Sequence, residues 1–279
     1  MKNRSEPDLI HYPPSIHECT IRDVAELTSN IFRIRFESES ISNHSRPGQF
    51  INIKVSHDLN PLWRRPFSIH DVNHGENVVD ILFKVIGQGT ESMSQMQAAQ
   101  NLNFIGPLGN SFDLPEDGVE NAIIIAGGIG IAPFMLLCRL LKEKNASVHL
   151  FWGGRDESDF YLLEEFKRTG AILHLSTDDG SVGYKGFVTS LFEKEMQDVL
   201  KSDVKNMIYA CGPNPMLHGI SEIAKRIDVP CQISLETLMA CGLGACLGCG
   251  VKRRKEEISY YYVCKDGPVF YSDEVDLSE

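Results

Sequence analysis

The chain has 279 residues, of which 42% are hydrophobic and 23% charged, and its formal net charge is −11. This length is sufficient for two or three small domains with cores of their own. The acidic balance argues against a nucleic-acid partner, because phosphate binding needs a basic face. No apolar run approaches the ~20 residues of a membrane span. The first residues also lack the apolar core of a secretion signal, so we expect a cytoplasmic protein with no membrane contact.

Short alternating strands dominate the chain from about residue 16. Residues 31–36, 50–55 and 78–86 alternate or run apolar between Gly, Pro and Asn turns. This pattern predicts an antiparallel β-barrel over residues 16–114. Within it, Arg65, Pro66, Phe67 and Ser68 follow one another on a strand. Alone, such an arginine is a surface charge, but a second motif supports a site.

That second motif is a glycine turn, which follows a strand and precedes the segment 91–99, where we expect a helix. It contains Gly89 and Thr90. A strand, a glycine turn and a helix start point amides and a hydroxyl at an anion.

The hydrophobic period changes after residue 115. Residues 121–126 form a continuous apolar run, as in a buried parallel strand. The turn with Gly128 and Gly130 follows, and then an apolar helix over 134–141, which together make a phosphate cradle. Pro133 stands where the common dinucleotide fingerprint has its third glycine. A glycine turn alone is weak evidence, since most such turns merely connect two elements.

Strands and helices continue to alternate beyond this turn, with strands at 147–152, 172–176 and 206–210 and a helix near 158–167. This alternation predicts a doubly wound parallel sheet over residues 115–232. Ligands bind at the carboxyl ends of such strands, where Cys211 and Gly212 fall. For the Cys211 thiol itself we favour a small buried residue over direct chemistry.

Two carboxylates bear on nucleotide choice. Asp178 and Asp179 follow the strand ending at residue 176 and would repel a 2′-phosphate, which favours NAD over NADP. They are equally compatible with a solvated turn, and Arg155 nearby has the opposite effect.

Four cysteines near the C-terminus have the spacing C-x4-C-x2-C-x14-C, typical of a plant-type [2Fe–2S] cluster, and they are Cys241, Cys246, Cys249 and Cys264. Structural zinc usually takes two C-x2-C knuckles, whereas these four cysteines contain one such pair, so the spacing favours the iron–sulfur cluster. A disulfide framework does not suit a chain without a secretion signal. Residues 233–279 are too few to fold by burial alone, so we expect a small module organised by the cluster.

The run from Arg65 to Ser68 and the glycine turn with Gly89 and Thr90 resemble the FAD site of the ferredoxin–NADP reductase superfamily. The signature of that site is Arg-x-(Tyr/Phe/Ile)-Ser/Thr. The resemblance implies that Arg65 binds the flavin pyrophosphate and that Ser68 lies near N5 of the isoalloxazine ring. Phe67 replaces the tyrosine of many relatives, so ring stacking is retained without a phenolic hydrogen bond. It also implies that further residues complete the flavin pocket, namely Pro66, Leu82, Phe83, Lys84, Gly89 and Thr90.

Residues 127–133 and 211–216 resemble the nicotinamide-nucleotide motifs GG-x-G-x-AP and CGP-x-x-M of the same superfamily. By this resemblance Gly128 and Gly130 cradle the pyrophosphate, while Cys211 and Gly212 flank the nicotinamide.

The order of flavin barrel, nucleotide sheet and [2Fe–2S] module is similar to the electron-transfer subunits of class 1B dihydroorotate dehydrogenase. The run around Cys264 and the position of Glu236 also fit that family. The resemblance implies a heterotetramer, two copies of this chain with two of an FMN-containing catalytic subunit, acting in pyrimidine biosynthesis. Electrons then run from dihydroorotate to FMN, the cluster, FAD and NAD+. No residue here suits oxidation of dihydroorotate, which we expect in the partner.

Two alternatives stay open at this point. One is a related FAD/[2Fe–2S] reductase subunit of a bifurcating ferredoxin–NADP oxidoreductase or a soluble hydrogenase. The other is a non-enzymatic interaction module, in which the four cysteines hold zinc.

Overall fold

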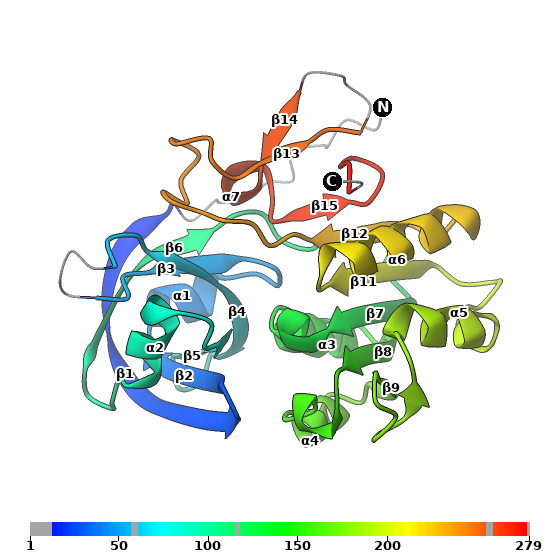
Figure 1. The fold of residues 1–279 in the computed structure, drawn as a ribbon, viewed down its shortest axis with the longest axis horizontal. Helices are drawn as coiled ribbons and strands as arrows, with labels where there is room; N and C mark the ends of the chain where they lie inside the picture. The colour runs from blue at the N-terminus through cyan, green and yellow to red at the C-terminus, as the bar shows by residue number, and fades with distance from the viewer. Residues whose placement is uncertain (1–12, 57–60, 115–117, 255–258, 278–279) are drawn as a thin grey trace.

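The structure is a computed structural model that describes residues 13–56, 61–114, 118–254 and 259–277. It contains a closed barrel, a seven-stranded sheet and a small C-terminal segment, seen in Figure 1 in blue to cyan, green to yellow, and orange to red. This confirms the predicted fold class. Residue 115, where we place the second domain's start, lies outside the described residues. No described helix is long and apolar enough to cross a lipid bilayer.

The barrel has the strand order β1-β2-β5-β4-β3-β6, with every pairing antiparallel. Alternate side chains fill its interior, among them Ile34, Ile51 and Phe104, each fully buried. Its elements are β1 (Ser15–Thr28), β2 (Ile31–Glu37), α1 (Glu39–His44), β3 (Phe50–Ile53), β4 (Arg65–Asn73), β5 (Val78–Lys84), α2 (Gln88–Ser94) and β6 (Asn101–Leu108).

The helix that we expect over 91–99 is α2, which begins at Gln88 and ends at Ser94. The Thr90 hydroxyl accepts hydrogen bonds from the backbone N–H groups of Ile86 and Gly87 and donates to the Gly87 carbonyl. These bonds close the first turn around Gly87, so the helix begins at Gln88.

The sheet has the order β10-β9-β8-β7-β11-β12-β15, and all its strands are parallel except β15. Helices α3 and α4 pack on one face and α5 and α6 on the other, as the doubly wound prediction requires. The elements are β7 (Asn121–Gly127), the 3-10 turn η1 (Gly128–Ile131), α3 (Phe134–Glu143), β8 (Ser147–Gly154), the 3-10 turn η2 (Glu157–Asp159), α4 (Leu163–Arg168), β9 (Ile172–Thr177), β10 (Tyr184–Lys185), α5 (Val188–Val199), β11 (Asn206–Cys211), α6 (Asn214–Arg226) and β12 (Cys231–Ser234).

The helix that we expect near 158–167 is split into η2 and α4. The Asp156 carboxylate accepts a hydrogen bond from the Ser158 backbone N–H and caps the short first turn. Phe160 and Leu162 are then buried in the core beneath the sheet, so the chain bends inward before α4 begins.

The C-terminal segment contains the hairpin β13 (Gly250–Lys252) and β14 (Tyr260–Tyr262), the short helix α7 (Val263–Asp266) and β15 (Val269–Tyr271). Strand β15 turns back and pairs antiparallel with β12, with Ile233 opposite Phe270. The boundary that we predict between residues 232 and 233 therefore falls inside β12, and the segment shares a sheet with the second domain.

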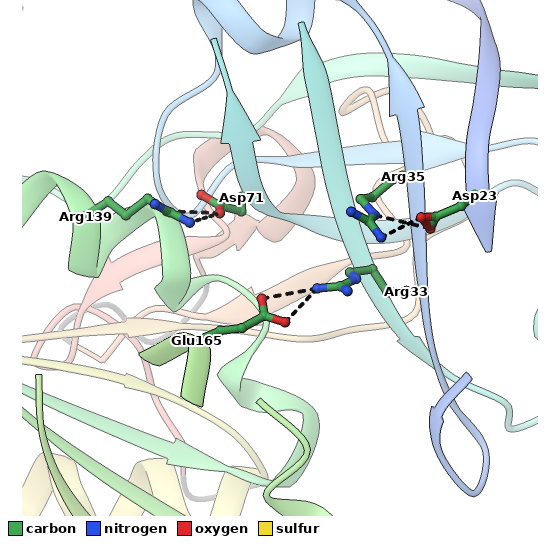
Figure 2. A network of polar contacts seen from close by, with 6 residues as sticks. All are labelled: Asp23, Arg33, Arg35, Asp71, Arg139 and Glu165. Atoms are coloured by element: carbon green, nitrogen blue, oxygen red, sulfur yellow. Dashed lines mark hydrogen bonds and ion pairs between the residues drawn. The ribbon is translucent and has the colours of Figure 1, made fainter. Parts of the chain in front are cut away.

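Ion pairs join the barrel to the sheet domain (Figure 2). Nη1 of Arg33, on β2, donates to both carboxylate oxygens of Glu165, on α4, at 2.9 and 3.1 Å. Arg139, on α3, donates through Nε to the Asp71 carboxylate of β4 at 2.9 Å. Arg33 and Asp71 are mostly buried, which makes such pairs less sensitive to solvent screening. They fix how the two domains meet.

Candidate functional site

A cavity of about 810 Å³ lies at the carboxyl ends of the parallel strands. The ends of β7, β8 and β11 and the starts of α5 and α6 form most of its wall, and the barrel contributes Ile31 and Lys84. This is where ligands bind in open α/β sheets. The cavity thus adjoins both predicted cofactor domains.

The two glycine turns predicted to bind a nucleotide meet in this cavity. A Cβ on Gly130 would lie 2.3 Å from the Cys211 carbonyl oxygen, so the turn after β7 packs directly against the end of β11. A Cβ on Gly128, by contrast, would have no atom within 4 Å, and this residue has φ +54°. The backbone at Gly128 is therefore open to the cavity, as the approach of a pyrophosphate requires.

Gly212 and Glu236 line the cavity near the end of β11, and the buried Cys211 is the last residue of that strand. Burial, reinforced by the Glu236 carboxylate, raises the pKa of the Cys211 thiol well above its ordinary value. The thiol thus stays protonated, in keeping with a small buried residue. Gly212 and Glu236 line the cavity itself. Glu236 is exposed to this open space, but surrounding protein atoms partly desolvate its carboxyl and raise its pKa.

The two carboxylates after β9 have different surroundings. Asp178 lines the cavity, whereas the Asp179 carboxylate accepts a hydrogen bond from the Ser181 N–H at 2.8 Å and turns into the following loop. The Arg155 side chain is 70% exposed, and its Nε lies 3.8 Å from Oδ2 of Asp159. Asp159 lines the cavity too, beside Asp178 and Glu236, and our reading of the sequence did not identify it.

The flavin motifs are brought together at the start of β4. A Cβ on Gly89 would lie 3.6 Å from Nε of Arg65, so the α2 turn and the arginine are neighbours. Nη1 of Arg65 donates to the carbonyls of Trp63 at 2.7 Å and Arg64 at 3.2 Å. The Thr90 hydroxyl is engaged by the backbone of its own turn. Arg65 and the turn's backbone are therefore the groups that can meet a phosphate.

The remaining predicted flavin residues lie on β4 and β5. Leu82 and Phe83 are buried, and the Phe83 ring stacks on Phe32 at 5.6 Å and meets the edge of Phe67 at 5.8 Å. A ligand could meet the backbone of Leu82 and Phe83 but not their side chains. Lys84 reaches the cavity.

The four predicted cluster ligands stand as two pairs. Sγ of Cys249 lies 3.3 Å from Sγ of Cys264, and the thiol of Cys246 interacts with Cys241. All four are free of disulfide bonds. Across the described part of the chain, no three His, Cys, Asp or Glu side chains gather around one ion-sized point. Two pairs of thiolates would suit a cluster with two irons.

Backbone amides point at these sulfurs. The N–H of Leu243 donates to Cys241 Sγ at 3.3 Å, and that of Gly244 to Cys264 Sγ at 3.1 Å. Partial burial opposes ionisation of Cys241, but hydrogen bonds from Leu243 and Cys246 outweigh it and lower its pKa to about 6. The loop therefore favours a thiolate at Cys241, the form that binds metal, whereas burial and the contact with Cys249 raise the pKa of Cys264. The four thiols and the amides around them fit an iron–sulfur cluster.

Three family models match the chain. They are described as the oxidoreductase FAD-binding domain, over residues 18–112, the oxidoreductase NAD-binding domain, over 124–222, and the iron–sulfur cluster binding domain of dihydroorotate dehydrogenase B, over 236–276. A protein of Desulforamulus reducens named "Dihydroorotate dehydrogenase B (NAD(+)), electron transfer subunit" is 38% identical over 93% of this chain and 98% of its own. The chain belongs to this family of electron transfer subunits.

A second relative has the same name, and two solved structures have a similar fold. A protein of the same name from Caldanaerobacter subterraneus is 39% identical over 89% of this chain and 94% of its own. A solved structure of an NADH-dependent reduced ferredoxin-NADP oxidoreductase has a TM-score of 0.80 at 27% identity, over 93% of this chain and 90% of that one. A ferredoxin reductase of carbazole 1,9a-dioxygenase has a TM-score of 0.65 at 20% identity, over 80% of this chain and 68% of that one, and shares the fold.

The family and the three matched domains confirm the predicted cofactors, FAD, NAD and an iron–sulfur cluster, and the chain is an oxidoreductase subunit. The iron–sulfur model spans all four cysteines, which favours iron over structural zinc. Sequence reasoning missed parts of the cavity wall, including Gly153 and Gly154 at the end of β8 and Phe187 before α5. The rule that ligands bind at strand ends points to the two glycines.

Proposed function

We propose that this chain carries electrons between NAD(H) and the FMN-containing catalytic subunit of a dihydroorotate dehydrogenase, by way of FAD and a [2Fe–2S] cluster, in pyrimidine biosynthesis. The observation that carries the proposal is that the three cofactor regions adjoin in one body. Lys84 of the barrel lines the nucleotide cavity. The barrel also contacts the cluster segment, since the N–H of Asn110, just after β6, donates to the Gly267 carbonyl at 2.7 Å. The cluster segment in turn joins the nucleotide sheet, because β15 pairs with β12.

Each cofactor has a set of residues in this proposal. Arg65 binds the pyrophosphate of FAD, and Ser68 lies beside the flavin N5. The open backbone at Gly128 and the close turn at Gly130 hold the pyrophosphate of NAD. When bound, the flavin exchanges a hydride with the nicotinamide and single electrons with the cluster.

Cys211 and Gly212 supply a small, neutral group of atoms beside the nicotinamide, because Cys211 is 2% exposed and its thiol stays protonated. The Glu236 carboxyl lines the same part of the cavity. Asp178 faces the same cavity and disfavours the 2′-phosphate of NADP, which supports NAD as the nucleotide.

The surface beside the cluster supports a partner subunit. Leu238, Leu243 and Leu247 are 92%, 49% and 53% exposed and lie in or next to the loop that holds the exposed Cys246. Exposed apolar groups of this kind mark interaction surfaces. We propose that the catalytic subunit covers them, as two copies of each chain. Eight free cysteines suit a reducing cytoplasm.

The test is reconstitution with a dihydroorotate dehydrogenase catalytic chain, using Cys249→Ser to weaken cluster binding. The variant should still pass electrons from NADH to an artificial acceptor but lose dihydroorotate-to-NAD+ activity. Gel filtration must show that the assembly, with two copies of each chain, is intact. An intact complex lacking the cluster that works at the wild-type rate would contradict the electron route. Failure to bind this partner would favour the bifurcating-reductase alternative, because this chain is also similar to a solved structure of such a reductase.

A further inference from the structure

Asn52 is a buried polar residue on the outer side of the barrel. It is fully buried on β3, between Ile51 and Ile53, whose side chains fill the barrel interior. Because side chains alternate along a strand, Asn52 points away from that interior. An amide placed there must find its partners outside the barrel.

The strand register places Asn52 on the same face as Ser68 of the flavin motif, whereas Arg65 and Phe67 lie on the other face of β4. Asn52 lies opposite Pro66, and Phe50 lies opposite Ser68, in the antiparallel pair β3–β4. Opposed residues of such a pair share a face, and so do residues two apart on one strand. Asn52 and Ser68 therefore belong to the same face.

The Asn52 side chain reaches from this face to the cluster loop. Its Nδ2 donates to the carbonyl oxygen of Cys241 at 3.2 Å, across 189 positions of sequence. A Cβ on Gly242, which has φ +70°, would lie 2.5 Å from the same nitrogen, so the loop approaches closely because that residue has no side chain. One side chain thus joins the flavin-motif strands to a cluster ligand.

The neighbouring residues bond the backbone of Asn52 but leave its side-chain oxygen without a hydrogen-bond partner among the described residues. Nη1 of Arg64 donates to the Asn52 carbonyl at 3.3 Å and to the Asn103 carbonyl at 3.2 Å, bridging β3 and β6. Oδ1 of Asn52 is buried without a hydrogen-bond partner in the described part of the chain. The reverse orientation of the amide would set two acceptors against each other, at Oδ1 and the Cys241 carbonyl. A leucine would pack there without an unsatisfied oxygen, so packing alone does not explain an amide.

We propose that Asn52 is a positioning residue that holds Cys241, and with it the cluster, at a fixed place relative to the flavin. This rests on the proposed function, because FAD and the cluster must occupy their predicted sites. Electron transfer between two centres slows steeply with separation, so a loop tied directly to the flavin-bearing strands maintains the rate. The same tie holds one thiolate ligand in the orientation that its iron needs.

The test compares Asn52→Leu with Asn103→Leu in the full-length holoprotein. Leucine has the same branching as asparagine but is larger, and it lacks the amide donor. Asn103 is the control, because its side chain bonds Arg64 and Glu18 on the same barrel and, among the described residues, makes no hydrogen bond with the cluster loop. The measurements are FAD content, the rate of flavin reduction by NADH, the rate of cluster reduction, the EPR spectrum of the reduced cluster and iron release to a chelator.

We expect Asn52→Leu to keep its FAD and its rate of flavin reduction. Cluster reduction should slow several-fold, because the electron-transfer rate falls as the distance between the two centres grows. The EPR spectrum should change and iron release should accelerate, whereas Asn103→Leu should match the wild type in both. An unchanged EPR spectrum and cluster reduction rate in Asn52→Leu would overturn the proposal.

A second variant keeps the test decisive if Asn52→Leu does not fold. Asn52→Ala is smaller than asparagine and lacks the donor, so it should show the same altered EPR spectrum and faster iron release. A folded Asn52→Ala protein with native values of both would overturn the proposal. If NADH fails to reduce the cluster in the wild type, the proposed function is wrong. The EPR spectrum and the rate of iron release would then still test whether Asn52 positions the cluster.

Discussion

Gly128 offers a sharp test of the nucleotide cavity, through the change Gly128→Ala. The residue has φ +54°, and a Cβ there would meet no atom within 4 Å. The methyl group therefore costs the folded protein about 1–2 kcal/mol, for a left-handed conformation at a non-glycine residue. The same methyl group would project into the open cavity, where we place the NAD pyrophosphate.

The expected loss is in nucleotide binding. Displacing the pyrophosphate from the backbone N–H groups removes one charge-assisted hydrogen bond, worth about 1.5–3 kcal/mol. NADH affinity should then fall by about 10–100-fold. The assay is titration of the flavin spectrum with NADH under anaerobic conditions, with thermal unfolding measured alongside.

Gly118→Ala is the matched control. Gly118 has φ +82°, also has no atom within 4 Å of a Cβ, and is not among the residues lining the nucleotide cavity. The two variants should lose similar stability, and only Gly128→Ala should lose affinity for NADH. If both bind NADH equally well, the pyrophosphate does not lie against Gly128.

Three further predictions follow from the charges around the cavity and the domain interface. Asp178→Asn should lower the preference for NADH over NADPH in kcat/KM about tenfold. An unchanged preference in stopped-flow reduction would show that this carboxylate does not determine nucleotide choice. Burial raises the pKa of Asp80 from 3.8 to about 7, so its folded form holds a proton that the unfolded form releases, and stability falls as pH rises between those values. Asp80→Asn should therefore stabilise the protein at pH 8 by at most ~4 kcal/mol and little at pH 4, and equal gains in urea unfolding at both pH values would refute this. Arg33→Ala should cost ~1–2 kcal/mol, with a double-mutant cycle assigning the loss to Glu165, and zero coupling would contradict it.

Local patterns in the sequence predict most of this fold. Alternation along residues 31–36 and the apolar run 121–126 depend on burial within single strands, and both segments form the expected strands. The cysteine spacing is local too, since Cys241, Cys246 and Cys249 lie on one loop. For the same reason the glycine turns could be recognised before their surroundings were known.

Features that depend on distant parts of the chain could not be predicted in this way. The bond from Asn52 to the Cys241 carbonyl spans 189 positions, and no motif surrounds that asparagine. The start of α2 depends on which backbone groups the Thr90 hydroxyl bonds. Asp178 and Asp179 are equivalent in the sequence, and a hydrogen bond from Ser181 decides which of them turns away from the cavity.

The antiparallel pairing of β15 with β12 links the cluster to the solubility of the protein. Beyond the pair itself, the Ser272 N–H donates to the Cys231 carbonyl, so the C-terminal segment covers the whole outer edge of β12. If the segment detaches when its cluster is lost, β12 becomes an edge strand with unpaired N–H and C=O groups. Such an edge is a template for pairing with another chain. Loss of iron should therefore lead to aggregation rather than to a stable apoprotein.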